Sequence, residues 1–136
     1  MISLSYRKIR NTRDPALIFG SGVILKVYCP DDLPESVLLP CSDIIIPSGL
    51  VFPGFRSYRF IPTQTTLPSN DAYSIIKHSG NRNTCLLMDC LFTADGELTT
   101  HLINLGNSEI IIHPGKPIMY CSVIKIEQLE LNEEQG

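Results

Sequence analysis

The chain has 136 residues, a formal net charge of −3, and 43% hydrophobic and 7% aromatic residues. This composition is that of one globular domain with a hydrophobic core, and it excludes a wholly disordered chain. The negative balance and the absence of any run of five like charges exclude a basic nucleic-acid stripe, so no nucleic-acid partner is expected.

The apolar residues come in short runs. No run approaches the roughly 20 consecutive apolar residues of a membrane span, and residues 1–8 lack the apolar centre of a signal peptide. We therefore expect no membrane span and an intracellular protein. The cysteines are odd in number and have no paired short spacing, so we expect reduced thiols that pack as small hydrophobes. They are Cys29, Cys41, Cys85, Cys90 and Cys121.

Six short apolar runs, separated by turn residues, are predicted to be β-strands. In chain order they cover residues 23–29, 42–46, 58–61, 98–104, 109–112 and 118–126. Pro47-Ser48-Gly49 is predicted to be a turn, and Asp95-Gly96 is the strongest hairpin signal, because this pair tolerates a positive φ. Only residues 71–78 have room for a short helix of about two turns. This pattern predicts an all-β sandwich, barrel or jelly roll. We place one domain at residues 1–130 and a short polar tail at 131–136.

The order of motifs along the chain resembles that of trimeric dUTPases. The strongest part runs from Asp95-Gly96-Glu97, through Asn104-Leu105-Gly106-Asn107 and Pro114-Gly115-Lys116-Pro117, to a final strand that reaches Glu127. Upstream, Ile46-Pro47-Ser48-Gly49 and Tyr58-Arg59-Phe60-Ile61-Pro62 also match, so that the resemblance spans about residues 7–127. It implies a distorted jelly roll with at most one short helix, a homotrimer, and Mg²⁺-assisted attack of water on dUTP.

Most of the family's polar motif residues are replaced. The Mg²⁺-holding Asp of the first motif is matched by Ile24, and the Arg-Ser-Gly phosphate clamp by Thr63-Gln64-Thr65. The Arg and Gln of the fourth motif are matched by Pro117 and Tyr120, and the glycine-rich fifth motif finds no match. Little catalysis is expected without these phosphate contacts. We therefore expect no catalytic residue, no metal site and no cofactor, with Mg²⁺ needed only if the chain is catalytic.

The third motif keeps its Asp and has a Phe at the position of its Tyr. Asp89 matches the family's water-orienting Asp, and Phe92 matches the ring that stacks on deoxyribose. The alternative interpretations are a strand-end carboxylate for Asp89 and ordinary packing for Phe92. Glu97 is the only candidate for the catalytic Glu of a related dCTP deaminase, and it also fits the family's hairpin Glu. A zinc site drawn from Cys85, Cys90, His101, His113 and Cys121 is disfavoured by their spacing.

The leading hypothesis is a non-catalytic dUTPase-like interaction module. The chain resembles the adenoviral early-region-four dUTPase-like proteins, which implies a viral early protein in the host cytoplasm or nucleus that engages host signalling proteins and self-associates as a homotrimer. Its binding loop is predicted within residues 63–83, with Thr63, Gln64, Thr65, Asn70, Lys77, His78 and Arg82 as candidates. The alternatives are a divergent dUTP pyrophosphatase that uses Asp89, and a structural assembly component.

Overall fold

A computed structural model describes residues 3–19, 23–62, 86–127 and 129–134. The strands are β1 (Arg7–Lys8), β2 (Ala16–Phe19), β3 (Val23–Tyr28), β4 (Ser36–Leu38), β5 (Asp43–Val51), β6 (Tyr58–Pro62), β7 (Leu86–Phe92), β8 (Glu97–Asn104), β9 (Ile110–Ile112) and β10 (Pro117–Lys125). One 3-10 turn, η1 (Phe55–Ser57), precedes β6. The described part of the chain is therefore all-β, as predicted.

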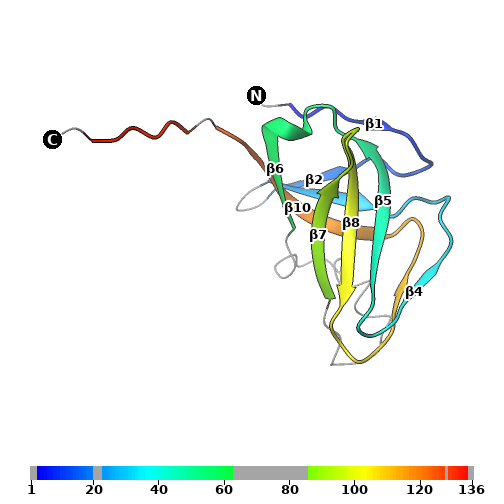
Figure 1. Cartoon of the computed structure of the whole chain (residues 1–136). Coiled ribbons are helices and arrows are strands. Elements are labelled where there is room, and N and C mark those ends of the chain that lie inside the picture. The colour runs from blue at the N-terminus through cyan, green and yellow to red at the C-terminus, as the bar shows by residue number, and fades with distance from the viewer. Residues whose placement is uncertain (1–2, 20–22, 63–85, 128, 135–136) are drawn as a thin grey trace.

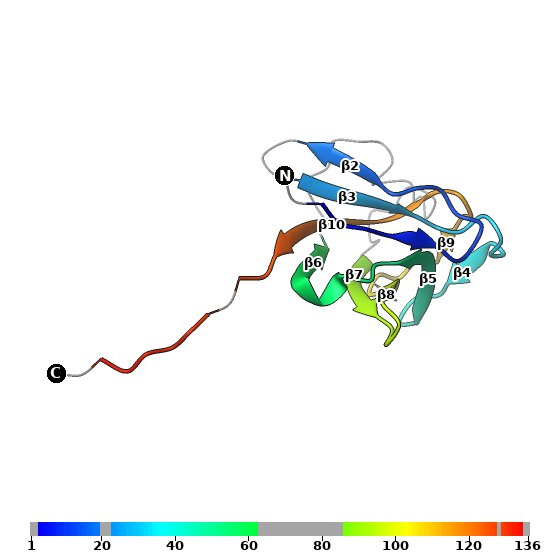
Figure 2. The same cartoon turned by 90° about the horizontal axis from the view of Figure 1, so that it is seen from above.

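The strands form two antiparallel four-stranded sheets and a small third one. Sheet A has the order β1-β5-β8-β7 and sheet B the order β2-β3-β10-β6, while β4 pairs with β9. Figure 1 shows β5, β8 and β7 side by side, with β10 and β2 crossing behind them. Figure 2 shows the two layers from above and the C-terminal tail projecting away from them. The architecture is of the jelly-roll type.

The core lies between the two sheets because successive residues of each strand alternate between its faces. Leu98, Thr100, Leu102 and Asn104 of β8 are fully buried, and Leu25 and Val27 of β3 face them from the other layer. The central strand β10 pairs with β3 on one side and with β6 on the other. Its first five residues are all buried.

The hairpin predicted at Asp95-Gly96 is confirmed. β7 and β8 pair up to Phe92 and Leu98, the Thr93 amide donates to the Glu97 carbonyl at 3.0 Å, and the Gly96 amide donates to the Thr93 carbonyl at 2.9 Å. Gly96 has φ +88°, and a Cβ there would lie 2.9 Å from the carbonyl oxygen of Phe52. This position therefore requires glycine for its backbone angle as well as for space.

The prediction of a turn at Pro47-Ser48-Gly49 is wrong. These residues lie inside β5, where the pairing with β8 shifts register between Pro47 and Val51. Gly49 takes φ +74°, and the Ser48 hydroxyl accepts the Leu50 amide at 3.0 Å, so the segment forms a β-bulge within a continuous strand. The sequence signal for a turn arose because a bulge uses the same residue types.

The other predicted strands are present, with ends displaced by one or two residues in most cases. Four strands are absent from the predicted set: β1, β2 and β4, which have only two to four residues each, and β7, which has seven. The predicted helix at 71–78 lies outside the described residues. No helix in the described part of the chain has the length and hydrophobicity needed to span a membrane.

Two thiols are sealed in the core. Cys29 is 2% exposed, and burial raises its pKa from 9.0 to about 11, with Asp31 and Asp32 adding to the effect. The pKa of the buried Cys121 is also raised, first by its hydrogen bond to Cys90 and then by burial. Cys41, by contrast, is an exposed free thiol.

We expect Ellman's reagent at pH 8 to modify Cys41 within minutes, and Cys29 and Cys121 only as fast as the protein unfolds. The thiolate is the reactive form, and both burial and the raised pKa suppress it. Because the pKa of Cys29 is higher in the folded state, stability should fall as the pH rises from 9 towards 11. Timed labelling with peptide mass spectrometry measures the rate at which each cysteine is modified. Labelling of Cys29 as fast as Cys41 would contradict the expected protection of Cys29.

Candidate functional site

The position that matches the family's Mg²⁺-holding carboxylate lies on sheet B. Ile24 is half-buried, alternates with the core residue Leu25, and stands opposite Ser122 of β10. Magnesium requires oxygen ligands, usually carboxylates with water. The hydrocarbon side chain of Ile24 supplies none, so the residues at this position do not fit Mg²⁺.

The two residues that match the fourth motif are packed into the fold. Pro117 is buried and stands opposite Tyr28, and Tyr120 is buried at 3% exposure opposite Lys26. The Lys26 ammonium lies 5.9 Å from the centre of the Tyr120 ring and 5.3 Å from that of Tyr28. Proline has no cation or amide donor for a phosphate, and the Tyr120 ring is engaged with Lys26.

The two residues that match the third motif face opposite sides of sheet A. Asp89 is exposed and pairs with His101 across the outer face, whereas Phe92 pairs with the buried Leu98 on the core side. The reason is the two-residue period of a strand, which places residues three apart on opposite faces. One nucleotide therefore cannot contact both side chains in this arrangement of the hairpin.

Asp89 belongs to a polar group on the outer face of sheet A. One of its carboxylate oxygens accepts the Cys90 amide at 2.8 Å. On the neighbouring strands, His101 Nε2 lies 2.7 Å from Asp43 Oδ2. The structure therefore places Asp89 beside a His–Asp pair, and places it on a different sheet from Ile24, Pro117 and Tyr120.

Phe92 packs into a cluster of aromatic rings. Its ring stacks on Phe55 with 4.8 Å between centroids, and meets the edge of Phe60 at 4.8 Å and that of Phe52 at 6.5 Å. Offset-stacked and edge-to-face contacts of this kind stabilise a core. This geometry favours the packing interpretation of Phe92 over a sugar platform.

Glu97 holds the β5 bulge in place. Its Oε2 accepts the Gly49 amide at 3.1 Å, which satisfies a donor that the bulge removes from the strand ladder. This contact favours the hairpin role over a deaminase role.

The candidate zinc ligands are engaged elsewhere. His113 Nδ1 lies 2.9 Å from Glu35 Oε2, and Cys90 Sγ lies 3.1 Å from Met119 Sδ. Within residues 3–19, 23–62, 86–127 and 129–134 there is no group of three or more His, Cys, Asp or Glu side chains placed to hold one metal ion. Cys85 and the predicted loop residues Thr63, Gln64, Thr65, Asn70, Lys77, His78 and Arg82 lie outside the described residues.

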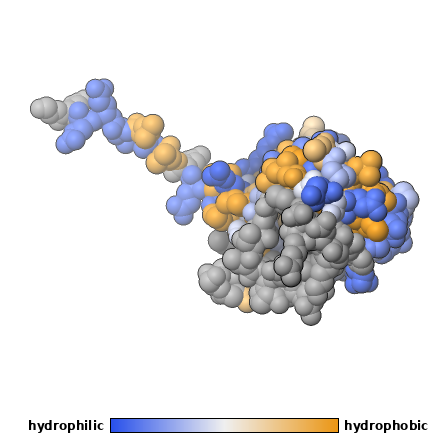
Figure 3. Space-filling model, turned by 90° about the horizontal axis from the view of Figure 1, so that it is seen from below, coloured by the Kyte–Doolittle hydropathy of each residue, from blue (hydrophilic) through white to orange (hydrophobic). Residues whose placement is uncertain are grey.

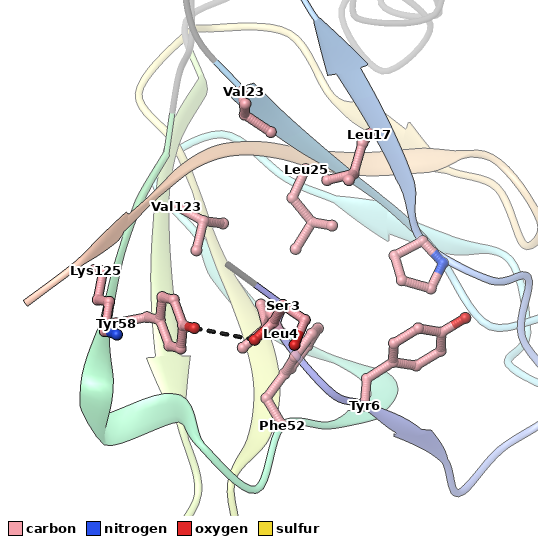
Figure 4. Close-up of a pocket in the computed structure, with 11 residues that line it drawn as sticks. Ser3, Leu4, Tyr6, Leu17, Val23, Leu25, Phe52, Tyr58, Val123 and Lys125 are labelled. Carbon is pink, nitrogen blue, oxygen red and sulfur yellow. Dashed lines mark hydrogen bonds between the residues drawn. The ribbon is translucent and has the colours of Figure 1, made fainter. Parts of the chain in front are cut away.

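An apolar pocket of about 520 Å³, which the sequence did not predict, lies beside the N-terminal segment. Its apolar wall includes Leu4, Leu17, Val23, Leu25, Phe52 and Val123 (Figure 4). At one end the Tyr58 hydroxyl donates to the Ser3 carbonyl at 3.1 Å, and Lys125 stands opposite Tyr58 in the sheet. Lys125 is the one charged side chain among the described lining residues. The wall combines residues from five separate segments, and no local pattern signals such an assembly.

Two packed antiparallel sheets with the β7–β8 hairpin define a jelly-roll-type protein. Comparisons of this chain with known proteins identify which jelly-roll-type fold it has. No protein-family model matches the sequence, and no curated protein matches it. Solved structures of phage dUTPases do match. A variant dUTPase of Staphylococcus bacteriophage 80alpha with dUpNHpp has 13% identity and a TM-score of 0.66, covering 100% of this chain and 98% of that chain.

The dUTPase from phage phi11 of S. aureus has 14% identity and a TM-score of 0.66, covering 99% of this chain and 97% of that chain. The 80alpha dUTPase itself has 12% identity and a TM-score of 0.61, over 98% of this chain and 97% of that chain. Likeness at these identities establishes a dUTPase-like fold. Activity must be argued from the residues of this chain.

Proposed function

We propose that this chain is a non-catalytic dUTPase-like protein that acts by binding other proteins. The observation that carries the proposal is the packing at positions 24, 117 and 120, where Ile24, Pro117 and Tyr120 replace polar residues of the family motifs. Each phosphate contact of this kind is worth about 3 kcal/mol of transition-state stabilisation in other enzymes. A chain that has lost several of these contacts is expected not to hydrolyse dUTP.

A regulatory role has support among the structural neighbours. Phage dUTPases of this group are described as controlling the transfer of virulence genes by a proto-oncogenic G protein-like mechanism. A dUTPase-like scaffold can therefore serve a role beyond nucleotide hydrolysis. For this chain we propose a viral early protein that engages host signalling factors, self-associates as a homotrimer, and works in the host cytoplasm or nucleus.

The direct test is pyrophosphate release from dUTP with Mg²⁺. We expect no release above the uncatalysed rate, and no heat of binding when dUpNHpp is titrated into the protein with Mg²⁺. The matched variant is Asp89→Asn, which leaves the size of the side chain unchanged and removes its charge. Turnover that disappears in this variant would establish the alternative, a divergent dUTP pyrophosphatase in which Asp89 orients the water.

The partner-binding half of the proposal needs its own test. Affinity capture from infected or host-cell lysate should be compared for the wild-type chain and a chain in which residues 63–83 are replaced by a glycine-serine linker. The predicted binding loop lies in this segment, so the linker variant should lose the specific partner. Capture of the same proteins by both chains would show that the partner-binding interface lies outside the replaced segment.

A further inference from the structure

Three sulfur atoms from the two sheets meet in the core of the protein. Cys90 Sγ on β7 donates to Met119 Sδ on β10 at 3.1 Å, and Cys90 is also hydrogen-bonded to Cys121, two residues further along β10. Residues two apart on a strand share a face, so Met119 and Cys121 both face sheet A. We call Cys90, Met119 and Cys121 the sulfur cluster. It lies where β10 crosses behind β7 in Figure 1.

The sulfur cluster is almost fully removed from water. Figure 3 shows hydrophobic and hydrophilic side chains side by side on the surface of the body, whereas Met119 and Cys121 are 0% exposed. Cys90 is half-buried and is the member of the cluster that solvent reaches. The hydroxyl of Thr100, which stands opposite Cys90 in sheet A, donates to Met119 Sδ at 3.7 Å. A small ion can therefore enter past Cys90 and be held where water is excluded.

Two thiols and a thioether are ligands for a soft metal ion. Thiolate and thioether sulfur suit Cu(I), whereas Mg²⁺ requires oxygen. Structural zinc takes four tetrahedral ligands, and within the described residues no His, Asp or Glu joins the two cysteines to make even a group of three. The spacing argument against a metal site considered zinc and its Cys and His ligands, and methionine is not among these. The sulfur cluster therefore fits Cu(I) better than zinc.

The spacing of the sulfurs is close to that of a three-coordinate site. Sulfur ligands lie about 2.3 Å from a bound zinc ion, and Cu(I) is of similar size, so three of them around one ion are about 4 Å apart. Cys90 and Met119 would have to separate by about 1 Å from their present 3.1 Å, which the three rotatable bonds of the unbranched Met119 side chain permit. The pairing of β7 with β8, and of β10 with β3 and β6, holds the ligand-bearing backbone in place.

We infer that the sulfur cluster is a Cu(I)-binding site, with the sulfurs of Cys90, Met119 and Cys121 as its ligands. The bound ion replaces the hydrogen bonds that join the three sulfurs, and each thiol releases its proton to solvent when its sulfur binds. The site needs none of the residues that match the dUTPase motifs. The inference is therefore independent of whether the protein hydrolyses dUTP or binds other proteins.

Competition for Cu(I) against bathocuproine disulfonate, a coloured Cu(I) chelator, measures binding under anaerobic conditions with ascorbate. The full chain should carry Cys41→Ser and Cys85→Ser, which remove the exposed thiol and the one that lies outside the described residues. We expect this chain to hold one Cu(I). Cys90→Ser and Cys121→Ser should each weaken binding by more than about 100-fold, because even an outer-shell partner of a metal site is worth about 10- to 100-fold.

Met119→Leu tests the thioether without disturbing the core. Leucine keeps the size and hydrophobicity of the side chain, so the variant should fold, and circular dichroism checks this. Its affinity for Cu(I) should fall by about 10-fold or more, because a ligand contributes at least as much as an outer-shell partner. The matched control is Cys29→Ala, which removes a buried thiol outside the sulfur cluster and should leave the affinity unchanged.

Thermal unfolding and X-ray absorption give two further readouts. Cu(I) at about 100 times its dissociation constant should raise the midpoint of unfolding by about 10 °C, and should raise that of Cys90→Ser much less at the same concentration. Absorption at the copper edge should show sulfur neighbours at about 2.3 Å.

Three outcomes would overturn the inference. If the chelator removes all Cu(I) from the folded chain, the sulfur cluster is ordinary core packing. If the variants of the cluster hold Cu(I) as tightly as Cys29→Ala does, the ion binds elsewhere. If mass spectrometry of the anaerobically purified chain finds a disulfide between Cys90 and Cys121, the two thiols form a cross-link and are not ligands.

Discussion

Replacing Phe92 with alanine is expected to lower the free energy of unfolding by about 2–4 kcal/mol. The ring contacts Phe52, Phe55 and Phe60, and its removal leaves a cavity in that aromatic cluster. Urea denaturation followed by far-UV circular dichroism measures the change. Far-UV detection suits this chain because it contains no tryptophan.

Two companion variants make the result informative about the vestigial site. Phe92→Tyr keeps the ring and should cost less than about 1.5 kcal/mol. Asp89→Asn changes an exposed side chain and should stay within about 0.5 kcal/mol of the wild type. If Phe92→Ala also stays within that margin, the ring does little packing, and a surface role such as stacking on a sugar becomes the better interpretation.

Replacing Asn104 with alanine is expected to destabilise the protein by about 2–4 kcal/mol. The side chain is fully buried, and its Nδ2 donates to the Leu38 carbonyl at 3.0 Å and to the Ser108 carbonyl at 2.8 Å. Its Oδ1 accepts the Gly106 amide at 3.0 Å. The substitution leaves three backbone groups without this partner where β4 and β8 meet the turn before β9.

The same denaturation experiment distinguishes hydrogen bonding from volume at this position. Asn104→Leu restores the volume without the donors, so it should remain destabilised by a similar amount. The exposed neighbour Asn107 provides the control, and Asn107→Ala should change stability by less than about 0.5 kcal/mol. Near-wild-type stability of Asn104→Leu would show that filling space is what matters there.

Much of the fold was predictable from local sequence. Asp95-Gly96 predicted the β7–β8 hairpin, because glycine readily adopts the positive φ that Gly96 has in that turn. Apolar and β-branched residues bounded by turn residues predicted β3 and β8. The bulge at Gly49 was mistaken for a turn, since proline, serine and glycine serve both structures. The length of β5 depends on pairing with β8, and that partner is distant in sequence.

The candidate site was predictable only in part. The loss of polar groups at Ile24, Pro117 and Tyr120 could be found by matching motifs, because it is a matter of residue identity. That Asp89 and Phe92 face opposite ways follows from strand periodicity, once β7 is known to be regular through both. The apolar pocket depends on non-local packing around Leu17 and Phe52, and no short pattern encodes it.

The position of β10 has a consequence for synthesis of the protein. This last strand supplies the middle of sheet B, between β3 and β6, and its residues Ile118–Cys121 fill the core. A nascent chain that has not yet released β10 from the ribosome exposes the apolar faces of both neighbouring strands. Folding is therefore expected to be slow, because the central contacts of sheet B join β10 to strands that are distant from it in sequence. Until β10 arrives, the unfinished sheet is a substrate for chaperones and a site for aggregation.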